Sequence, residues 1–130
     1  MTGNGSCTVT NKTKGTQALA RVPFVAIKNK ILGEKYELSI TFLTASMQRK
    51  INKKYRNKDE TTNILSFPLS KTSGEITLDP LKIKSESPLF EMSYSQFLKY
   101  LVIHGTLHLK GFEHSSTMEK EEEKYLNMFS

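Results

Sequence analysis

All three histidines of the chain fall within one segment, His104-Gly105-Thr106-Leu107-His108-Leu109-Lys110-Gly111-Phe112-Glu113-His114. A helix places His104 and His108 on one face because they are four residues apart. Their positions continue the apolar spacing of the preceding turns, so this face points toward the core. Gly111 suits a left-handed helix end, after which the chain can turn back with His114. The spacing therefore predicts a helix, a turn and a three-histidine metal site.

The chemistry of this ligand set favours a catalytic metal over a structural one. Three neutral imidazoles leave a fourth position open, which is typical of one catalytic zinc ion with a bound water. The chain has a single cysteine, Cys7, far away in the sequence, which argues against a thiolate-rich structural site. All-imidazole sites also accept nickel, cobalt or copper, so the spacing leaves the identity of the metal open.

The histidine spacing is similar to the metzincin protease motif, H-E-x-x-H-x-x-G-x-x-H, except at one position. In those proteases the glutamate after the first histidine is the general base, and here that residue is Gly105. The nearby carboxylate is Glu113, which either orients a metal ligand or lies solvated in a turn; we favour the second interpretation. The sequence thus identifies no general base.

Length and composition indicate one small domain. The chain has 130 residues, of which 37% are hydrophobic and 25% charged. We expect residues 1–20 to form a tail or an edge strand, and residues 21–130 to form the functional domain. There is no apolar run long enough to span a membrane and no apolar leader, so we expect a cytoplasmic protein with no membrane partner.

Hydrophobic periodicity predicts alternating helices and short strands. Helices are expected from Pro23 to Gly33, from Thr44 or Ser46 onward, from Ser93 to Gly111, and from a capping box of Ser116 and Glu119. Strands are expected at residues 36–42, 63–67 and 74–78, with a possible edge strand at residues 7–10. Pro68 either ends the second of these strands or marks it as an edge strand. Residues 79–92 contain two prolines and are expected to be an irregular connection. These elements indicate an α+β or α/β domain.

Two of the expected helices have contrasting polar faces. The helix after Thr44 has an apolar stripe, Met47, Ile51 and Tyr55, amid basic residues. The last helix has an acidic face of Glu119, Glu121, Glu122 and Glu123 opposite its apolar side chains.

Positive charge is concentrated in the first half of the chain. Residues 1–71 contain 13 Lys and Arg against 4 Asp and Glu, whereas residues 72–130 contain 6 against 9. A face with this charge either binds the phosphates of a nucleic acid or is simply solvated. The residues that we predict to bind a nucleic acid are Arg49, Lys50, Lys53, Lys54 and Arg56; the family resemblance given below implies that this nucleic acid is RNA.

The histidine segment resembles the signature H-G-x-L-H-L-x-G-[YF]-[DE]-H of the YbeY family of bacterial rRNA-maturation endoribonucleases. A second block, Tyr55-Arg56-x-Lys58-Asp59-x-x-Thr62-Asn63-Ile64-Leu65-Ser66-Phe67-Pro68, is also similar to that family. Gly74-Glu75-Ile76 resembles a third block, in which Asp is commoner than Glu75. The resemblance covers about residues 36–126, and residues 79–92 are shorter than the family's usual connection.

The resemblance implies a mixed sheet flanked by helices, with a zincin-like histidine helix and zinc on His104, His108 and His114. It implies a zinc-dependent hydrolase, an endoribonuclease specific for single strands, that acts in 3′-end maturation of 16S ribosomal RNA and in ribosome quality control. The implied partners are the small ribosomal subunit or its assembly factors, and no DNA. Arg56 and His114 are the implied catalytic residues.

The residues alone leave other roles open. Arg56 can bind phosphate through two parallel hydrogen bonds, or it can support a loop through backbone carbonyls. Asn63 and Ser66 can line a cleft beside the metal or complete the hydrogen bonds of a strand. Two other functions are a non-catalytic ribosome-assembly factor that binds RNA and a metzincin-like zinc peptidase with its base elsewhere. As a mechanism we expect zinc to activate water or polarise a phosphoryl oxygen, with Arg56 stabilising the transition state.

Overall fold

A four-stranded mixed sheet forms the middle layer of the fold, in strand order β1-β2-β4-β3. The computed structural model describes residues 5–15, 21–58, 60 and 62–130. The strands are β1 (Cys7–Asn11), β2 (Glu37–Phe42), β3 (Ile64–Ser70) and β4 (Ser73–Leu78). β1 and β4 are both parallel to β2. β4 follows β3 after a tight turn and pairs with it antiparallel. β3 is therefore an edge strand, which lets it contain Pro68.

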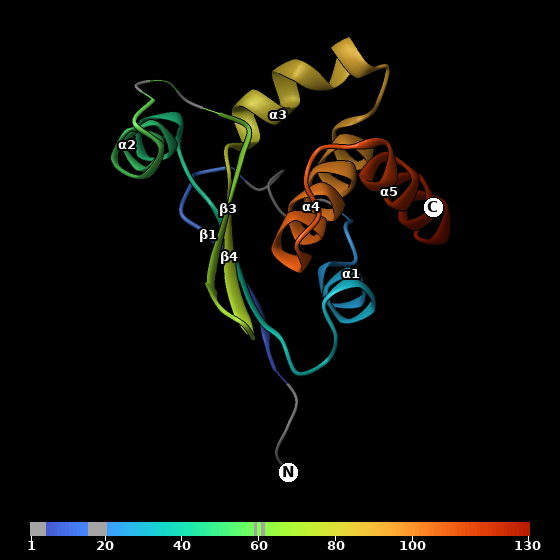
Figure 1. Ribbon diagram of the computed structural model, residues 1–130. Coiled ribbons are helices and arrows are strands. Elements are labelled where there is room, and N and C mark those ends of the chain that lie inside the picture. Colours follow the sequence, from blue (N-terminus) through green and yellow to red (C-terminus); the bar gives the residue numbers. More distant parts are fainter. Residues whose placement is uncertain (1–4, 16–20, 59, 61) are drawn as a thin grey trace.

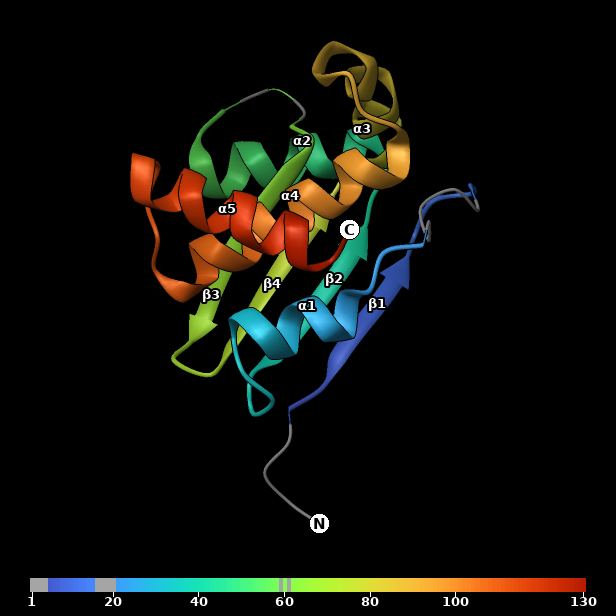
Figure 2. The same cartoon turned by 90° about the vertical axis from the view of Figure 1, so that its right-hand side faces the viewer.

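Helices cover the two faces of the sheet unequally. The helices are α1 (Phe24–Ile31), α2 (Ala45–Arg56), α3 (Pro80–Glu86), α4 (Tyr94–Lys110) and α5 (Ser116–Met128), with a 3₁₀ turn at Ser87–Phe90. Figure 1 shows α1, α4 and α5 on one side of the sheet and α2 on the other. Figure 2 looks onto the face with α1, α4 and α5. This architecture confirms the α+β mixed sheet flanked by helices.

The core lies between α4 and the sheet. Phe97, Leu98, Val102, Ile103 and Leu107 of α4 are at most 1% exposed, and they meet buried residues of β2, β4 and α1. Ser93 caps this helix in a capping box with Gln96, as the sequence predicts. Because so much apolar surface is buried along α4, the helix is a rigid base for the side chains on its exposed rim.

The edge strand at residues 7–10 is present as β1, which pairs with β2. The division of the chain at residue 20 stays a prediction. None of the helices in the described part of the chain combines the length and the apolar character that a membrane span requires.

The connection at residues 79–92 was expected to be irregular, and this expectation is wrong. It contains α3 and the 3₁₀ turn. The carboxylate of Asp79 accepts hydrogen bonds from the N–H groups of Leu81 and Lys82, and Pro80 occupies the first helical position, where its missing N–H costs nothing. The two prolines therefore start short helices and do not break them.

The apolar stripe of α2 does not pack into the core. Met47 is 39% and Tyr55 63% exposed, whereas Gln48 and Asn52 are buried at 0% and 2%. The Gln48 side-chain amide donates to the carbonyl of Thr77 (3.1 Å), and the Asn52 amide donates to the carbonyl of Glu60 (2.9 Å). α2 is thus attached to its neighbours by buried amides, and its apolar stripe faces outward.

Candidate functional site

His104, His108 and His114 come together where α4 ends. His104 and His108 lie one turn apart on α4, with their Nε2 atoms 3.0 Å from each other. Gly111 ends the helix at φ 115°, a left-handed conformation that costs glycine little, and the chain then turns back. The ring of His114 lies 5.2 Å from that of His104 and 4.7 Å from that of His108, centre to centre. One nitrogen from each ring lies within 4.8 Å of the others, so the three histidines could hold a metal ion.

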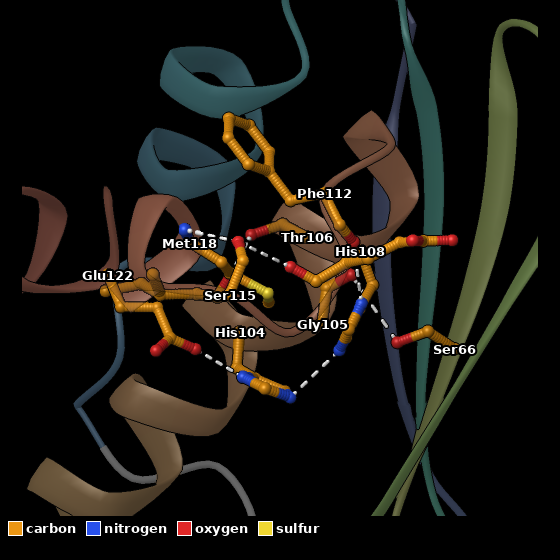
Figure 3. A network of polar contacts seen from close by, with 11 residues as sticks. Ser66, His104, Gly105, Thr106, His108, Phe112, Ser115, Met118 and Glu122 are labelled. Atoms are coloured by element: carbon orange, nitrogen blue, oxygen red, sulfur yellow. Dashed lines mark hydrogen bonds and ion pairs between the residues drawn. The ribbon is translucent and has the colours of Figure 1, made fainter. Parts of the chain in front are cut away.

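Both helical rings are held by their Nδ1 atoms. His108 Nδ1 is 2.9 Å from the carbonyl oxygen of Phe112, and His104 Nδ1 contacts the carboxylate of Glu122 (Figure 3). A carbonyl and a carboxylate only accept, so Nδ1 is the donor in each ring. Each Nε2 then presents a lone pair, and the two lone pairs face one another. A cation between them removes this repulsion, so the hydrogen bonding fits a metal site.

The protonation of His108 also suits a metal ligand. Burial lowers the pKa of His108, and the two neighbouring imidazoles lower it further, while the hydrogen bond to Phe112 and the charge of Glu122 act in the opposite direction. A lowered pKa means that less proton competition opposes metal binding as the pH falls, because metals bind the neutral ring.

The sequence did not identify Glu122, which was assigned to the solvated acidic face of the last helix. Glu122 is only 6% exposed, because α5 packs against α4 and directs the Glu122 carboxylate at His104. The signal was its spacing: Met118, Glu122 and Tyr125 follow the i, i+4, i+7 pattern of the buried face. Glu113, the carboxylate weighed at first, is exposed. Ser115, not the expected Ser116, caps α5.

Replacing Glu122 with glutamine is expected to weaken metal binding about 10- to 100-fold, the usual effect of losing a group that orients a histidine ligand. The amide keeps the shape but loses the charge that favours Nδ1–H on His104. Zinc affinity measured by competition with a chromophoric chelator checks this. Glu123→Gln, the same change one residue along the exposed side of α5, is the matched control. Equal affinities of the two variants would contradict the assignment of Glu122.

Arg56 lies in the same cavity as the histidines. The cavity has a volume of about 330 Å³, and its lining comprises Arg56, Ile64, Leu65, Ser66, His104, His108 and His114. The Arg56 guanidinium donates to the backbone carbonyl of Ser66 (3.4 Å), so it is supported by β3 while its side chain stays exposed. Ser66 also lines the cavity, whereas Asn63 turns away to donate to Glu86 (3.0 Å).

Gly105 packs closely against the sheet. A side chain here would bring its Cβ to 2.9 Å from Ile64 and about 3.0 Å from the Ser66 hydroxyl, because α4 lies directly on β3. The Ser66 hydroxyl itself lies 3.4 Å from the Gly105 carbonyl (Figure 3). The position that holds the glutamate in metzincins therefore faces the sheet, and no carboxylate lines the cavity among the described residues.

The basic residues of α2 are all exposed, but they are not all near the histidines. Of this set only Arg56, at the C-terminal end of the helix, lines the histidine cavity. Lys50 and Lys54 line a second pocket, whose other lining residues come from α2, β3 and β4. The structure thus brings together His104, His108, His114 and Arg56, whereas Arg49, Lys50, Lys53 and Lys54 lie on α2 outside the histidine cavity.

Comparisons with known proteins find relatives that share one name. A family model described as "Endoribonuclease YbeY" matches residues 5–130. The relative named Endoribonuclease YbeY in Neorickettsia sennetsu is 33% identical over 128 residues, which cover 90% of this chain and 87% of the relative. The relative of the same name in Azorhizobium caulinodans is 34% identical over 113 residues, covering 81% and 70%.

A solved structure supports the fold independently of sequence. The solution structure of a Thermotoga maritima protein matches with a TM-score of 0.67 at 24% identity, over 94% of this chain and 87% of that one. The match thus spans the sheet and the helices that surround it. With a family model that matches nearly the whole length, the chain belongs to the YbeY endoribonuclease family.

Proposed function

We propose that this chain is a zinc-dependent endoribonuclease that cuts single-stranded RNA. The observation that carries the proposal is the pair of oriented His104 and His108 rings, whose Nε2 atoms converge beside Arg56 in one cavity. The name of its relatives, Endoribonuclease YbeY, supports the reaction type. Zinc is the metal we propose because three imidazoles with an open position are its usual catalytic ligand set.

Zinc on His104, His108 and His114 would supply a Lewis acid for a phosphoryl oxygen or for water. The chain's own residues supply the rest. Glu122 and the Phe112 carbonyl hold the two helical rings in the tautomer that leaves Nε2 free. Arg56 binds the phosphate to be cut and stabilises the charge that develops on its oxygens. In this scheme Arg56 and His114 contact the reacting group, His114 from the turn after α4.

The proposed RNA-binding face is the exposed side of α2. Arg49, Lys50, Lys53 and Lys54 would contact phosphates without reading sequence, so binding should weaken steeply with salt. α2 contains no acidic residue between Ala45 and Arg56, so nothing on the helix opposes a polyanion.

In the cell we propose that the RNA is ribosomal. The reaction would be maturation of the 3′ end of 16S ribosomal RNA and quality control of ribosomes, with the small subunit or its assembly factors as partners. The place of action would then be the cytoplasm, where ribosomes are assembled. The support for this step is the family membership of the chain.

The test of the function is cleavage of end-labelled single-stranded RNA, with casein as a parallel substrate. Zinc-loaded protein is expected to cut the RNA, and chelator-treated protein is expected to leave it intact until zinc is restored. Intact RNA with salt-sensitive binding would contradict an enzyme and favour a non-catalytic assembly factor. Cleavage of casein alone would favour a peptidase, in spite of the packed position of Gly105.

A further inference from the structure

A second pocket lies across the edge strand from the histidine cavity. Ser66 of β3 lines the histidine cavity, and the next residue of the strand, Phe67, lines this pocket. It has a volume of about 520 Å³ and lies between α2, β3 and β4. The lining residues used below are Lys50, Lys54, Tyr55, Phe67 and Glu75.

Aromatic side chains give the pocket an open platform. The rings of Tyr55 and Phe67 are 5.5 Å apart, centre to centre, at an angle of 62°. Tyr55 lies on the outward face of α2 and is 63% exposed. An exposed aromatic ring next to a pocket offers a flat face on which a nucleic-acid base can stack.

Two lysines flank this platform. The Lys54 ammonium lies over one face of the Tyr55 ring, 5.3 Å from its centre, and Lys50 lines the same pocket one turn earlier on α2. Within the described ranges neither lysine forms an ion pair with a carboxylate, and both side chains are exposed. Each is therefore able to swing onto a phosphate.

Glu75 decides which part of a nucleotide enters. It pairs with Phe67 across the two strands, and it lines the pocket with a negative charge. A carboxylate repels a phosphate, whereas it accepts hydrogen bonds from the amino groups of bases. The base is thus expected to enter beside Glu75, while the phosphate stays at Lys50 and Lys54.

We propose that this pocket binds an unpaired base of the RNA substrate, a few nucleotides from the phosphate that is cut. The inference rests on the proposed function and extends it. The two sites are joined by pairs of sequence neighbours, Tyr55 with Arg56 on α2 and Ser66 with Phe67 on β3. Since β3 is the edge of the sheet, an RNA strand can pass from one face to the other over that edge.

The proposal explains why the substrate should be single-stranded. A base can stack on Tyr55 only when it is unpaired, because the ring lies in a pocket between α2, β3 and β4. A duplex would keep its bases stacked inside the helix and would offer α2 only phosphates. The pocket therefore reads the unpaired state, and Glu75 favours a base that carries an amino group.

The first experiment measures single-turnover cleavage of an end-labelled single-stranded RNA by zinc-loaded protein. Tyr55→Ala is expected to raise the protein concentration for half-maximal rate about tenfold, within the range for loss of a stacked base, and to leave the maximal rate within about twofold. Tyr55→Phe keeps the ring and should behave like wild type. Lys54→Gln should weaken binding more than Lys53→Gln, which removes the same charge one residue away but outside the pocket.

The second experiment places one abasic nucleotide at successive positions of the RNA. An abasic nucleotide at one position near the cut should lower the affinity of the wild-type protein for the RNA about tenfold. The same nucleotide should lower the affinity of Tyr55→Ala only slightly, because the missing base and the missing ring belong to the same contact. Equal binding by Tyr55→Ala and wild type would overturn the proposal and favour a protein as occupant. If the wild type cuts no RNA, the proposed function fails, and anisotropy with uncut RNA still tests the pocket.

Discussion

Replacing His108 with alanine is expected to abolish zinc retention and to lower RNA cleavage by about a thousandfold or more. His108 contributes an Nε2 atom that the Phe112 carbonyl orients from the other side of the ring. Alanine removes the ligand and leaves two imidazoles, one of them on an exposed turn, which bind zinc far more weakly. Zinc per chain after dialysis, measured by elemental analysis beside the cleavage rate, checks both parts.

The control for this variant is Lys110→Ala, an exposed position two residues along the same helix. It should retain zinc and cleavage, and both variants should give the helical circular dichroism of the wild type without metal. Full zinc occupancy in His108→Ala would show that the ligand assignment is wrong. Lost cleavage with retained zinc would move His108 from metal binding to another role.

Replacing Arg56 with alanine is expected to lower the maximal rate of cleavage about 10²- to 10³-fold, the usual effect of removing a donor that stabilises transition-state charge. The zinc content should stay at the wild-type value, because Arg56 reaches the cavity from α2 and not from the histidine segment. Arg56→Lys should recover only part of the rate, since an ammonium cannot make two parallel hydrogen bonds to a phosphate. Single-turnover rates with saturating protein separate this effect from binding.

Lys58→Ala is the matched control for Arg56, because it removes one exposed charge just beyond α2. It is expected to change the maximal rate by less than twofold. A similar loss in both variants would mean that Arg56 acts only through general electrostatic attraction. A loss of affinity alone in Arg56→Ala would make it a binding residue and would contradict its catalytic assignment.

Sequence patterns correctly predicted the features that are determined by residues close together in the chain. The spacing of the histidines sufficed to bring His104 and His108 together, because both lie on one helix and Gly111 turns the chain. The strands of the sheet followed from alternation, and Ser93 from its capping box. In these places the neighbours that decide the structure are a few residues away in the sequence.

The features that were missed depend on tertiary contacts. Glu122 looked like one more member of a charged face, and only the packing of α5 on α4 shows that it meets His104. The apolar stripe on α2 does not reveal which face of the helix is buried, because Gln48 and Asn52 find hydrogen-bond acceptors and are buried instead. Residues 79–92 contain prolines that favour an irregular chain as readily as a first helical turn, until Asp79 supplies the cap.

The attachment of α2 through two buried amides has a consequence for redesign. Its outward side chains contribute little to the core, so a designer can exchange them with slight effect on folding. The exposed residues of α2 other than Tyr55 and Arg56 can be varied in a library, while Gln48 and Asn52 stay fixed because they hold the helix in place. The surface of this helix can therefore be changed while the rest of the fold stays the same, and variants with altered substrate preference are best sought there.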